Sequence, residues 1–143
     1  MKDDRSTLQT LTLVFGVVFL AVGILGFIPG ITTRYGDLGF AGSDSGSKLL
    51  GLFQVSMLHN IVHLLFGLAG LLAARSFDSS RIYMLGGGVI FLALFVLGLF
   101  GGADWIPANN ADDWLHLGLG VVMVGIGYLF GREALTVDRA APA

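Results

Sequence analysis

The chain of 143 residues contains no cysteine. This absence excludes thiol catalysis, disulfide exchange and cysteine-ligated metals, and with them a major class of four-helix membrane oxidoreductase. Any redox role would therefore need a bound cofactor. Charge is also scarce, because only 13% of the residues are charged, and eight basic against ten acidic residues give a formal net charge of -2. This near balance, with no basic patch, argues against a nucleic-acid partner or an acidic substrate.

Hydrophobic residues make up 55% of the chain, and the mean hydropathy is +0.81. A soluble domain of this length cannot bury so much apolar surface, so we expect a membrane protein in contact with the lipid bilayer. Four apolar segments are long enough to cross the ~30 Å hydrocarbon core as helices. They predict an all-α, four-transmembrane-helix bundle that forms one domain over residues 1–143, with helices at about 8–28, 49–74, 82–100 and 114–130.

Residues that favour turns separate these segments. Pro29-Gly30 ends the first one, and residues 31–47 predict an extramembrane loop without regular elements. A short turn at 75–81 and a second loop at 101–113 separate the later segments. The first segment is too long for a signal peptide, and no A-x-A-like cleavage site follows it, so we expect it to remain as a helix.

Basic residues are distributed unevenly about the four expected spans. Arg34 and Lys48 fall on one side, and six fall on the other: Lys2, Arg5, Arg75, Arg81, Arg132 and Arg139. Because basic residues are enriched in cytoplasmic segments, both termini are predicted to be cytoplasmic. The loops at 29–47 and 101–113 should then lie outside.

Two parts of the chain are similar in sequence. Residues 16–26 align without a gap on residues 88–98, and seven of the eleven positions are identical. His59 and His116 each lie 16 residues before the arginine that closes their segment. These matches predict a duplicated helical hairpin, with helices 1–2 and 3–4 related by a pseudo-twofold axis along the membrane normal. The two histidines should then sit at matching depth.

Polar side chains interrupt the second apolar segment. His59, Asn60 and His63 lie within it, and His59 and His63 are four residues apart and so share a helix face. Polar groups at this depth cost free energy unless they are hydrogen-bonded, so we expect them to face the interior together with His116. His63 lies one turn deeper than His59, and Gly120 takes the equivalent place in the second half.

Three interpretations of these residues remain open. In the first, His59, Asn60, His63 and His116 form a buried hydrogen-bonded network that fixes the register of the helices. In the second, the histidines bind a tetrapyrrole, by clamping a haem iron or by ligating a chlorophyll magnesium. In the third, they hold Zn²⁺ or Cu²⁺, or relay protons, although the expected spans carry no charged residue that would complete a proton path.

Three stretches of the chain together resemble a known family. Residues 26–30 read Gly-Phe-Ile-Pro-Gly, residues 58–68 read Leu-His-Asn-Ile-Val-His-Leu-Leu-Phe-Gly-Leu, and residues 110–117 read Asn-Ala-Asp-Asp-Trp-Leu-His-Leu. Over about residues 8–130 the chain resembles DUF4383, a family of small bacterial membrane proteins without an assigned activity. The resemblance implies a multi-pass protein of the bacterial plasma membrane, and it implies no mechanism. Its motif positions in this chain are His59, Asn60, His63 and His116.

The sequence favours a non-catalytic function. The expected spans contain no nucleophile constellation, no pair of acid–base carboxylates and no nucleotide motif. The leading expectation is an accessory or structural subunit of a larger membrane complex, in contact with other membrane-protein subunits or with further copies of itself. Tetrapyrrole binding or electron transfer, with haem or chlorophyll as the cofactor, is the alternative. A small transporter or a metal-binding membrane protein ranks lower.

Overall fold

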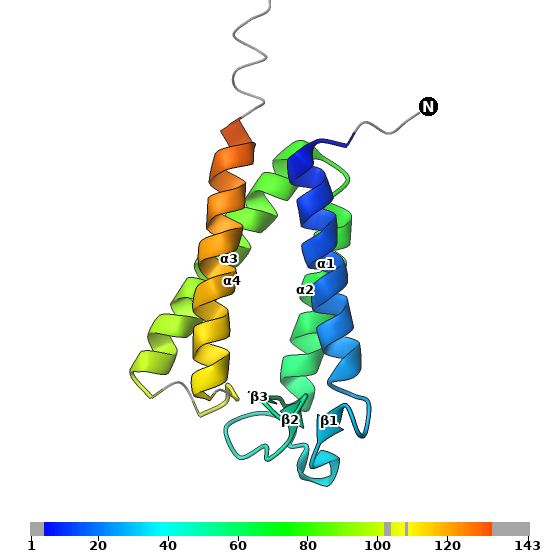
Figure 1. Ribbon diagram of the computed structural model, residues 1–143, viewed down its shortest axis with the longest axis vertical. Helices are drawn as coiled ribbons and strands as arrows, with labels where there is room; N and C mark the ends of the chain where they lie inside the picture. Colours follow the sequence, from blue (N-terminus) through cyan, green and yellow to red (C-terminus); the bar gives the residue numbers. More distant parts are fainter. Residues whose placement is uncertain (1–4, 102–103, 108, 133–143) are drawn as a thin grey trace, which may run out of the picture.

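The computed structural model of the protein describes residues 5–101, 104–107 and 109–132. Within these ranges the chain forms four α-helices: α1 (Thr7–Leu25), α2 (Met57–Ala73), α3 (Phe77–Leu99) and α4 (Asn110–Leu129). A small sheet lies between α1 and α2, and short 3-10 turns occur at Tyr35–Asp37 (η1) and Phe130–Arg132 (η2). The predicted all-α membrane fold with four helices is confirmed (Figure 1).

Length separates α2 from the other described helices. Helices α1, α3 and α4, the last extended to Arg132, have 19, 23 and 23 residues and are apolar enough to cross a membrane. Helix α2 is apolar but has only 17 residues, which at about 1.5 Å per residue is slightly shorter than the ~30 Å hydrocarbon core. The prediction of a helix from residue 49 to residue 74 is wrong at its N-terminal end, because residues 48–54 form strands and a turn.

Side-chain oxygens cap the N-termini of the four described helices. On α1, the Ser6 hydroxyl accepts a hydrogen bond from Gln9 N at 3.2 Å, and Gln9 Oε1 accepts one from Ser6 N at 3.1 Å. Ser56, Ser76 and Asn109 cap α2, α3 and α4 by accepting from the backbone of the third helical residue. Helices α3 and α4 therefore begin before the predicted residues 82 and 114, because a polar first turn is not visible as an apolar run.

The C-terminal end of α1 also has a specific cause. The Thr32 hydroxyl donates to the backbone carbonyls of Leu25 and Gly26, both at 3.1 Å. Carbonyl groups in the last turn of a helix have no partner inside the helix, so this side chain satisfies two of them. As a result α1 ends at Leu25, three residues before the end predicted at residue 28.

The segment between α1 and α2 contains a three-stranded antiparallel sheet. Its strands, in spatial order, are β1 (Thr32–Thr33), β2 (Lys48–Leu49) and β3 (Phe53–Gln54). Leu50 and Gly51 turn the chain between β2 and β3 with φ of 54° and 72°, in the left-handed region that favours glycine. The prediction that residues 31–47 lack regular elements is wrong, because strands of two residues leave no periodic pattern in the sequence.

The helices pack as two pairs. Helix α1 packs mainly against α2, and α3 packs mainly against α4. We call these pairs the first hairpin and the second hairpin. Figure 1 shows that the start of α1 and the end of α4 lie at the same end of the molecule, and that the sheet lies at the opposite end.

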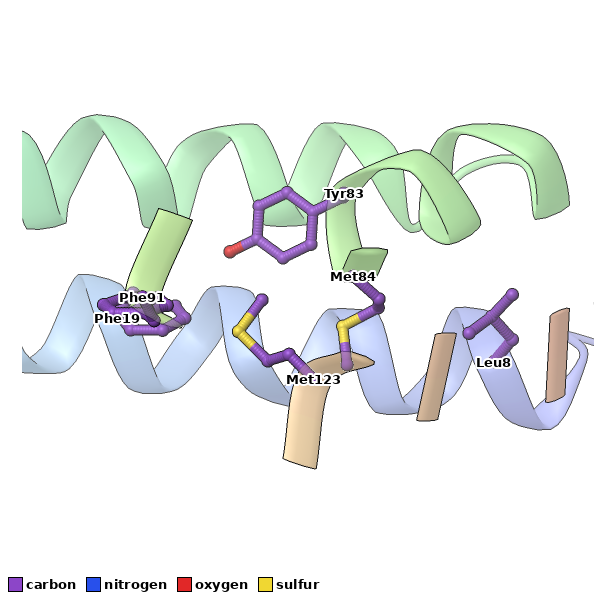
Figure 2. Close-up of a cluster of buried hydrophobic side chains, with 6 residues drawn as sticks. All are labelled: Leu8, Phe19, Tyr83, Met84, Phe91 and Met123. Atoms are coloured by element: carbon purple, nitrogen blue, oxygen red, sulfur yellow. The ribbon is translucent and has the colours of Figure 1, made fainter. Parts of the chain in front are cut away.

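Aromatic and sulfur-containing side chains join the two hairpins. The buried core consists of residues from α1, α3 and α4, shown in Figure 2: Leu8, Phe19, Tyr83, Met84, Phe91 and Met123. The Tyr83 hydroxyl donates to the Phe66 carbonyl of α2 at 3.1 Å and so ties α3 to the first hairpin. The core therefore holds the hairpins together through contacts that neither hairpin makes alone.

Glycines allow a close backbone approach within each hairpin. A Cβ at Gly16 would lie 3.1 Å from the Gly67 carbonyl oxygen, and a Cβ at Gly67 would lie 2.8 Å from the Gly16 carbonyl oxygen. In the second hairpin, Gly88 and Gly120 make the same reciprocal approach, at 3.0 Å in both directions. Small residues at such crossings are how transmembrane helices pack without a hydrophobic driving force between them.

Candidate functional site

The three histidines of the chain lie together between the hairpins. His59 and His63 come from α2 and His116 comes from α4, and all three line two cavities of about 150 Å³ and about 230 Å³. The smaller cavity is also lined by the sheet region and by Asp112. The larger cavity is lined by α3 and by Trp105 and its neighbours. The histidines thus form a shared wall of both cavities, whereas their role as a binding site stays a prediction.

The two histidines of α2 are in direct contact. The centroids of the His59 and His63 rings are 4.1 Å apart, and Nδ1 of His63 lies 3.0 Å from the His59 carbonyl oxygen. Because a carbonyl oxygen only accepts, this hydrogen bond requires the proton on Nδ1 of His63. The Nε2 atom of a neutral His63 then carries a lone pair, ready to accept a proton donor or to bind a metal.

The histidine of α4 is more deeply buried. The His116 side chain is 6% exposed, and its Nδ1 atom has no hydrogen-bond partner in the described part of the chain. Its ring lies against Phe91, with 5.6 Å between the ring centroids. A buried ring nitrogen without a partner is costly, so the position of His116 is not explained by hydrogen bonding at Nδ1 among the described residues.

Asn60 is separate from the cavities. Its side chain is fully buried, and its Oδ1 atom lies 3.5 Å from Nδ1 of His59, which is a weak contact. The carboxamide packs so closely on Gly26 of α1 that a Cβ there would overlap it. Asn60 therefore faces α1, while the histidines face the space between the hairpins.

The aromatic contacts relate the histidines by approximate symmetry. Phe19 of α1 and Phe91 of α3 stack on each other with 5.3 Å between centroids and planes 9° apart. Phe19 contacts His63 at 5.8 Å, and Phe91 contacts His116 at 5.6 Å. Each hairpin thus contributes one Phe–His pair, and the two phenylalanines meet between the hairpins.

This arrangement corrects the predicted alignment of the two halves. The structure pairs His63 with His116, an offset of 53 residues, instead of pairing His59 with His116. The helix caps Ser56 and Asn109 show the same offset. The predicted register was one helical turn off because it was measured from the closing arginines, which lie beyond the ends of α2 and α4.

With the corrected register, the even helices share a sequence pattern. Residues 60–67 and 113–120 both read Asn/Asp-x-x-His-Leu-x-x-Gly. Asp113 packs against Gly98 as Asn60 packs against Gly26, so that a Cβ at either glycine would overlap the polar side chain. One polar atom of each, Nδ2 of Asn60 and Oδ1 of Asp113, is buried without a partner in the described residues.

Asp112 is the site residue that the sequence did not reveal. Its carboxylate is 4% exposed and lines the smaller cavity, at the position that corresponds to His59. Its Oδ2 atom accepts hydrogen bonds from the backbone N–H groups of Asn109 and Gln54, both at 3.0 Å. From the sequence, Asp112 is expected in the loop at 101–113, where the start of the next helix favours an acidic side chain. The repeated Asn/Asp-x-x-His pattern is the signal that points to its position.

The segment between α1 and α2 is hydrogen-bonded to the second hairpin. Besides the bond from Gln54 to Asp112, the Asn109 side chain donates to the Leu52 carbonyl at 2.8 Å, and Ser43 N donates to the Asp104 carbonyl at 3.2 Å. The sheet region therefore covers the N-terminal start of α4 and closes one side of the smaller cavity.

The described residues set limits on the chemistry of this site. No group of three His, Asp or Glu side chains in the described ranges has the spacing needed to hold a metal ion. Apart from the histidines and Asp112, the lining is apolar. The arrangement therefore suits the recognition of an apolar molecule that carries one or two hydrogen-bonding groups.

A family comparison covers this whole region. The model of DUF4383, a domain of unknown function, matches residues 9–129. The chain belongs to the DUF4383 family. The match includes both Asn/Asp-x-x-His segments and nearly all of the four helices of this DUF4383 protein. No curated protein and no solved structure matches it significantly.

Proposed function

We propose that this DUF4383 protein is a small, non-catalytic integral membrane protein that serves as an accessory or structural subunit of a larger membrane complex. The supporting observation is that each described helix carries large apolar side chains on its outer surface. One residue of each helix illustrates this surface, with more than half of its side chain exposed: Val17, Leu65, Val89 and Val121. Such surfaces pack against lipid or against the spans of other proteins.

The polar groups support the same proposal. Several polar side chains serve the fold itself: Ser56 caps α2, and the Ser80 and Tyr83 hydroxyls donate to backbone carbonyls. A protein whose polar side chains serve its own fold, and whose outer surface is apolar, is suited to assembly.

Native mass measurement of the extracted protein tests this proposal. We expect a particle heavier than the 15.1 kDa chain with its detergent. Replacing Val17, Leu65, Val89 and Val121 by Trp, one at a time, is the matched series. At least one of these variants should fail to assemble into the complex, because a large ring blocks a contact between proteins, whereas lipid accommodates the ring. A monomeric particle that turns over a small substrate would contradict the proposal.

We further propose a bacterial plasma membrane location with both termini in the cytoplasm. The end of the molecule that carries the start of α1 and the end of α4 also carries Arg75, in the turn between α2 and α3, and Arg81, near the start of α3. Basic residues at one end favour the cytoplasmic side. Because the chain has no cysteine, Ser43→Cys and Ser79→Cys report topology directly. An impermeant thiol reagent should label only Ser43→Cys, and equal labelling would contradict the orientation.

Tetrapyrrole binding is the second candidate function. The observation that favours it is that three imidazoles line one cavity. Nδ1 of His63 donates a hydrogen bond to a backbone carbonyl, as the second ring nitrogen does in many ligating histidines. The cavities of about 150 and 230 Å³ are smaller than the roughly 300–1,000 Å³ of usual ligand pockets. A macrocycle would therefore need the hairpins to separate. A Soret band after purification with supplemented haem tests this candidate, and its absence contradicts it.

A small transporter or a metal-binding protein ranks lower. Metal binding would require His59, His63 and His116 to move toward one another, because the described side chains do not form a ligand set. Zinc or copper titration of the purified protein measures this directly.

A further inference from the structure

The larger of the two cavities has features of a binding site that a purely structural role does not require. It has a volume of about 230 Å³ and lies between α2, α3 and residues 105–107. An engineered apolar cavity of about 150 Å³ holds one benzene molecule. The cavity is therefore large enough for a single substituted six-membered ring.

Apolar side chains form most of the wall. Val62 of α2, Ile90 and Leu94 of α3, and the Trp105 indole line the cavity. Val62 and Ile90 are also partly exposed on the outer surface of their helices. The cavity therefore borders the surface that faces lipid, and a ligand dissolved in the membrane has the shortest route to it.

Two imidazoles supply the polar groups. Nε2 of His63 is a hydrogen-bond acceptor, because the His59 carbonyl fixes the proton on Nδ1 at 3.0 Å. His116 is 6% exposed, lines the same cavity, and has an unpartnered Nδ1 atom. The second ring in the cavity wall is thus that of His116, and the acceptor that the hydrogen bond to the His59 carbonyl fixes is the one on His63.

We propose that this cavity binds the ring of a membrane-soluble quinol. A quinol hydroxyl donates to Nε2 of His63, which supplies the proton donor that this acceptor lacks. A quinone has only carbonyl acceptors at these positions, so it leaves Nε2 of His63 without a donor and binds less well. The apolar tail of the quinol extends into the lipid. Binding is non-covalent and involves no electron transfer, and it stands apart from the question of whether the chain is a subunit.

Trp105 provides the readout, because it lines the cavity while the other tryptophan does not. Trp114 is exposed and lies against Phe95, with 6.0 Å between centroids. In the Trp114→Phe variant, Trp105 is the sole tryptophan.

This full-length variant, in lipid nanodiscs, is titrated with decylubiquinol under reducing conditions. We expect saturable quenching of Trp105 fluorescence. The Trp105→Phe variant, which retains Trp114, should show only the linear quenching that arises from partition into lipid.

Selectivity for the hydroxyl group is the second measurement, and it uses no histidine variant. Decylubiquinone should bind at least about fivefold more weakly than decylubiquinol, because one hydrogen bond is lost. Equal binding of the two forms would overturn the proposal, as would purely linear quenching. Competition with an excess of cholesterol separates a quinol site from a site for alicyclic alcohols. Displacement of the quinol by cholesterol would also overturn it.

The His63→Phe substitution tests the acceptor itself in the Trp114→Phe background. It preserves a planar ring and removes Nε2, and we expect about tenfold weaker quinol binding. Leu65→Ala is the matched control, because Leu65 lies on the exposed side of the same helix. This control should bind as the parent does. Unchanged binding in a folded His63→Phe variant would overturn the proposal, and the quinol-to-quinone ratio decides the matter if that variant does not fold.

Discussion

The first and second hairpins share their packing and differ at their outer ends. Both cross through a reciprocal glycine contact, and both place a phenylalanine beside a histidine at the interface. The first hairpin carries the three-stranded sheet and His59, whereas the second carries a shorter connection and Asp112. The comparison shows that the two halves are alike where their helices pack closely. They differ at the end of the molecule that carries the sheet, and this difference makes the site asymmetric.

The exchange of His59 for Asp112 has a clear physical result. Asp112 accepts from the backbone of Gln54, which belongs to the other hairpin. Among the described residues His59 makes no such bond to the other hairpin, and its ring packs against His63. Asp112 therefore joins the hairpins, whereas His59, at the corresponding position, contributes to the cavity wall.

The glycine crossings should give the largest effects. Gly16→Ala and Gly88→Ala should each lower the free energy of unfolding by about 1–3 kcal/mol, because the added Cβ would lie 2.8 Å from a backbone nitrogen of the partner helix. Similar losses in the two variants would support equivalent packing. Gly86→Ala and Gly118→Ala are the controls, because nothing lies within 4 Å of either added Cβ. They should be neutral or slightly stabilising. Reversible unfolding in mixed micelles measures the stability of all four variants. A large loss of stability in only one of Gly16→Ala and Gly88→Ala would show that the two crossings are not equivalent.

Asp112 should give a smaller and asymmetric effect. Asp112→Ala leaves the N–H groups of Gln54 and Asn109 without their acceptor, which should cost roughly 2 kcal/mol. Asp112→Asn retains an acceptor oxygen and should cost less. His59→Ala is the matched change in the first hairpin, and the Gln54 amide should stay protected in it. Hydrogen exchange at Gln54 distinguishes these outcomes. Equal loss of protection in Asp112→Ala and His59→Ala would show that Asp112 does not join the hairpins.

The helix caps should show the smallest difference. Ser56→Ala removes one hydrogen bond to the His59 backbone and should cost about 1 kcal/mol. Asn109→Ala removes the equivalent bond and also the bond to the Leu52 carbonyl, so its cost should be somewhat larger. Ser56→Thr and Asn109→Asp retain the capping oxygen and serve as controls. Identical costs for the two alanine variants would mean that the contact with Leu52 adds nothing measurable.

Sequence patterns predicted the helices well because apolar length decides membrane insertion. Four apolar runs were sufficient to predict four helices and the expected fold class. The start of α2 was not predictable, because Leu49, Leu50 and Phe53 are as apolar as the helix that follows. Their conformation depends on pairing with Thr32 and on a left-handed turn at Leu50, and hydropathy contains neither kind of information.

The candidate site was predictable in part. His59, His63 and His116 were identified because imidazoles are rare in apolar segments, and the structure brings all three to one space. Asn60 belongs to the same motif but faces α1, because only the three-dimensional position of Gly26 determines which way it packs. Asp112 was read as part of a loop, since nothing in a single sequence distinguishes a carboxylate covered by a distant strand from a solvated one.

The stacked pair of Phe19 and Phe91 has a consequence for the origin of the chain. Two copies of one hairpin that met face to face would each present the same aromatic ring to the other at a twofold axis, and the observed planes are only 9° apart. A self-complementary contact of this kind is what holds a symmetric homodimer together. A tandem copy of one hairpin, joined at the turn between Ala73 and Phe77, would place this self-complementary contact within a single chain.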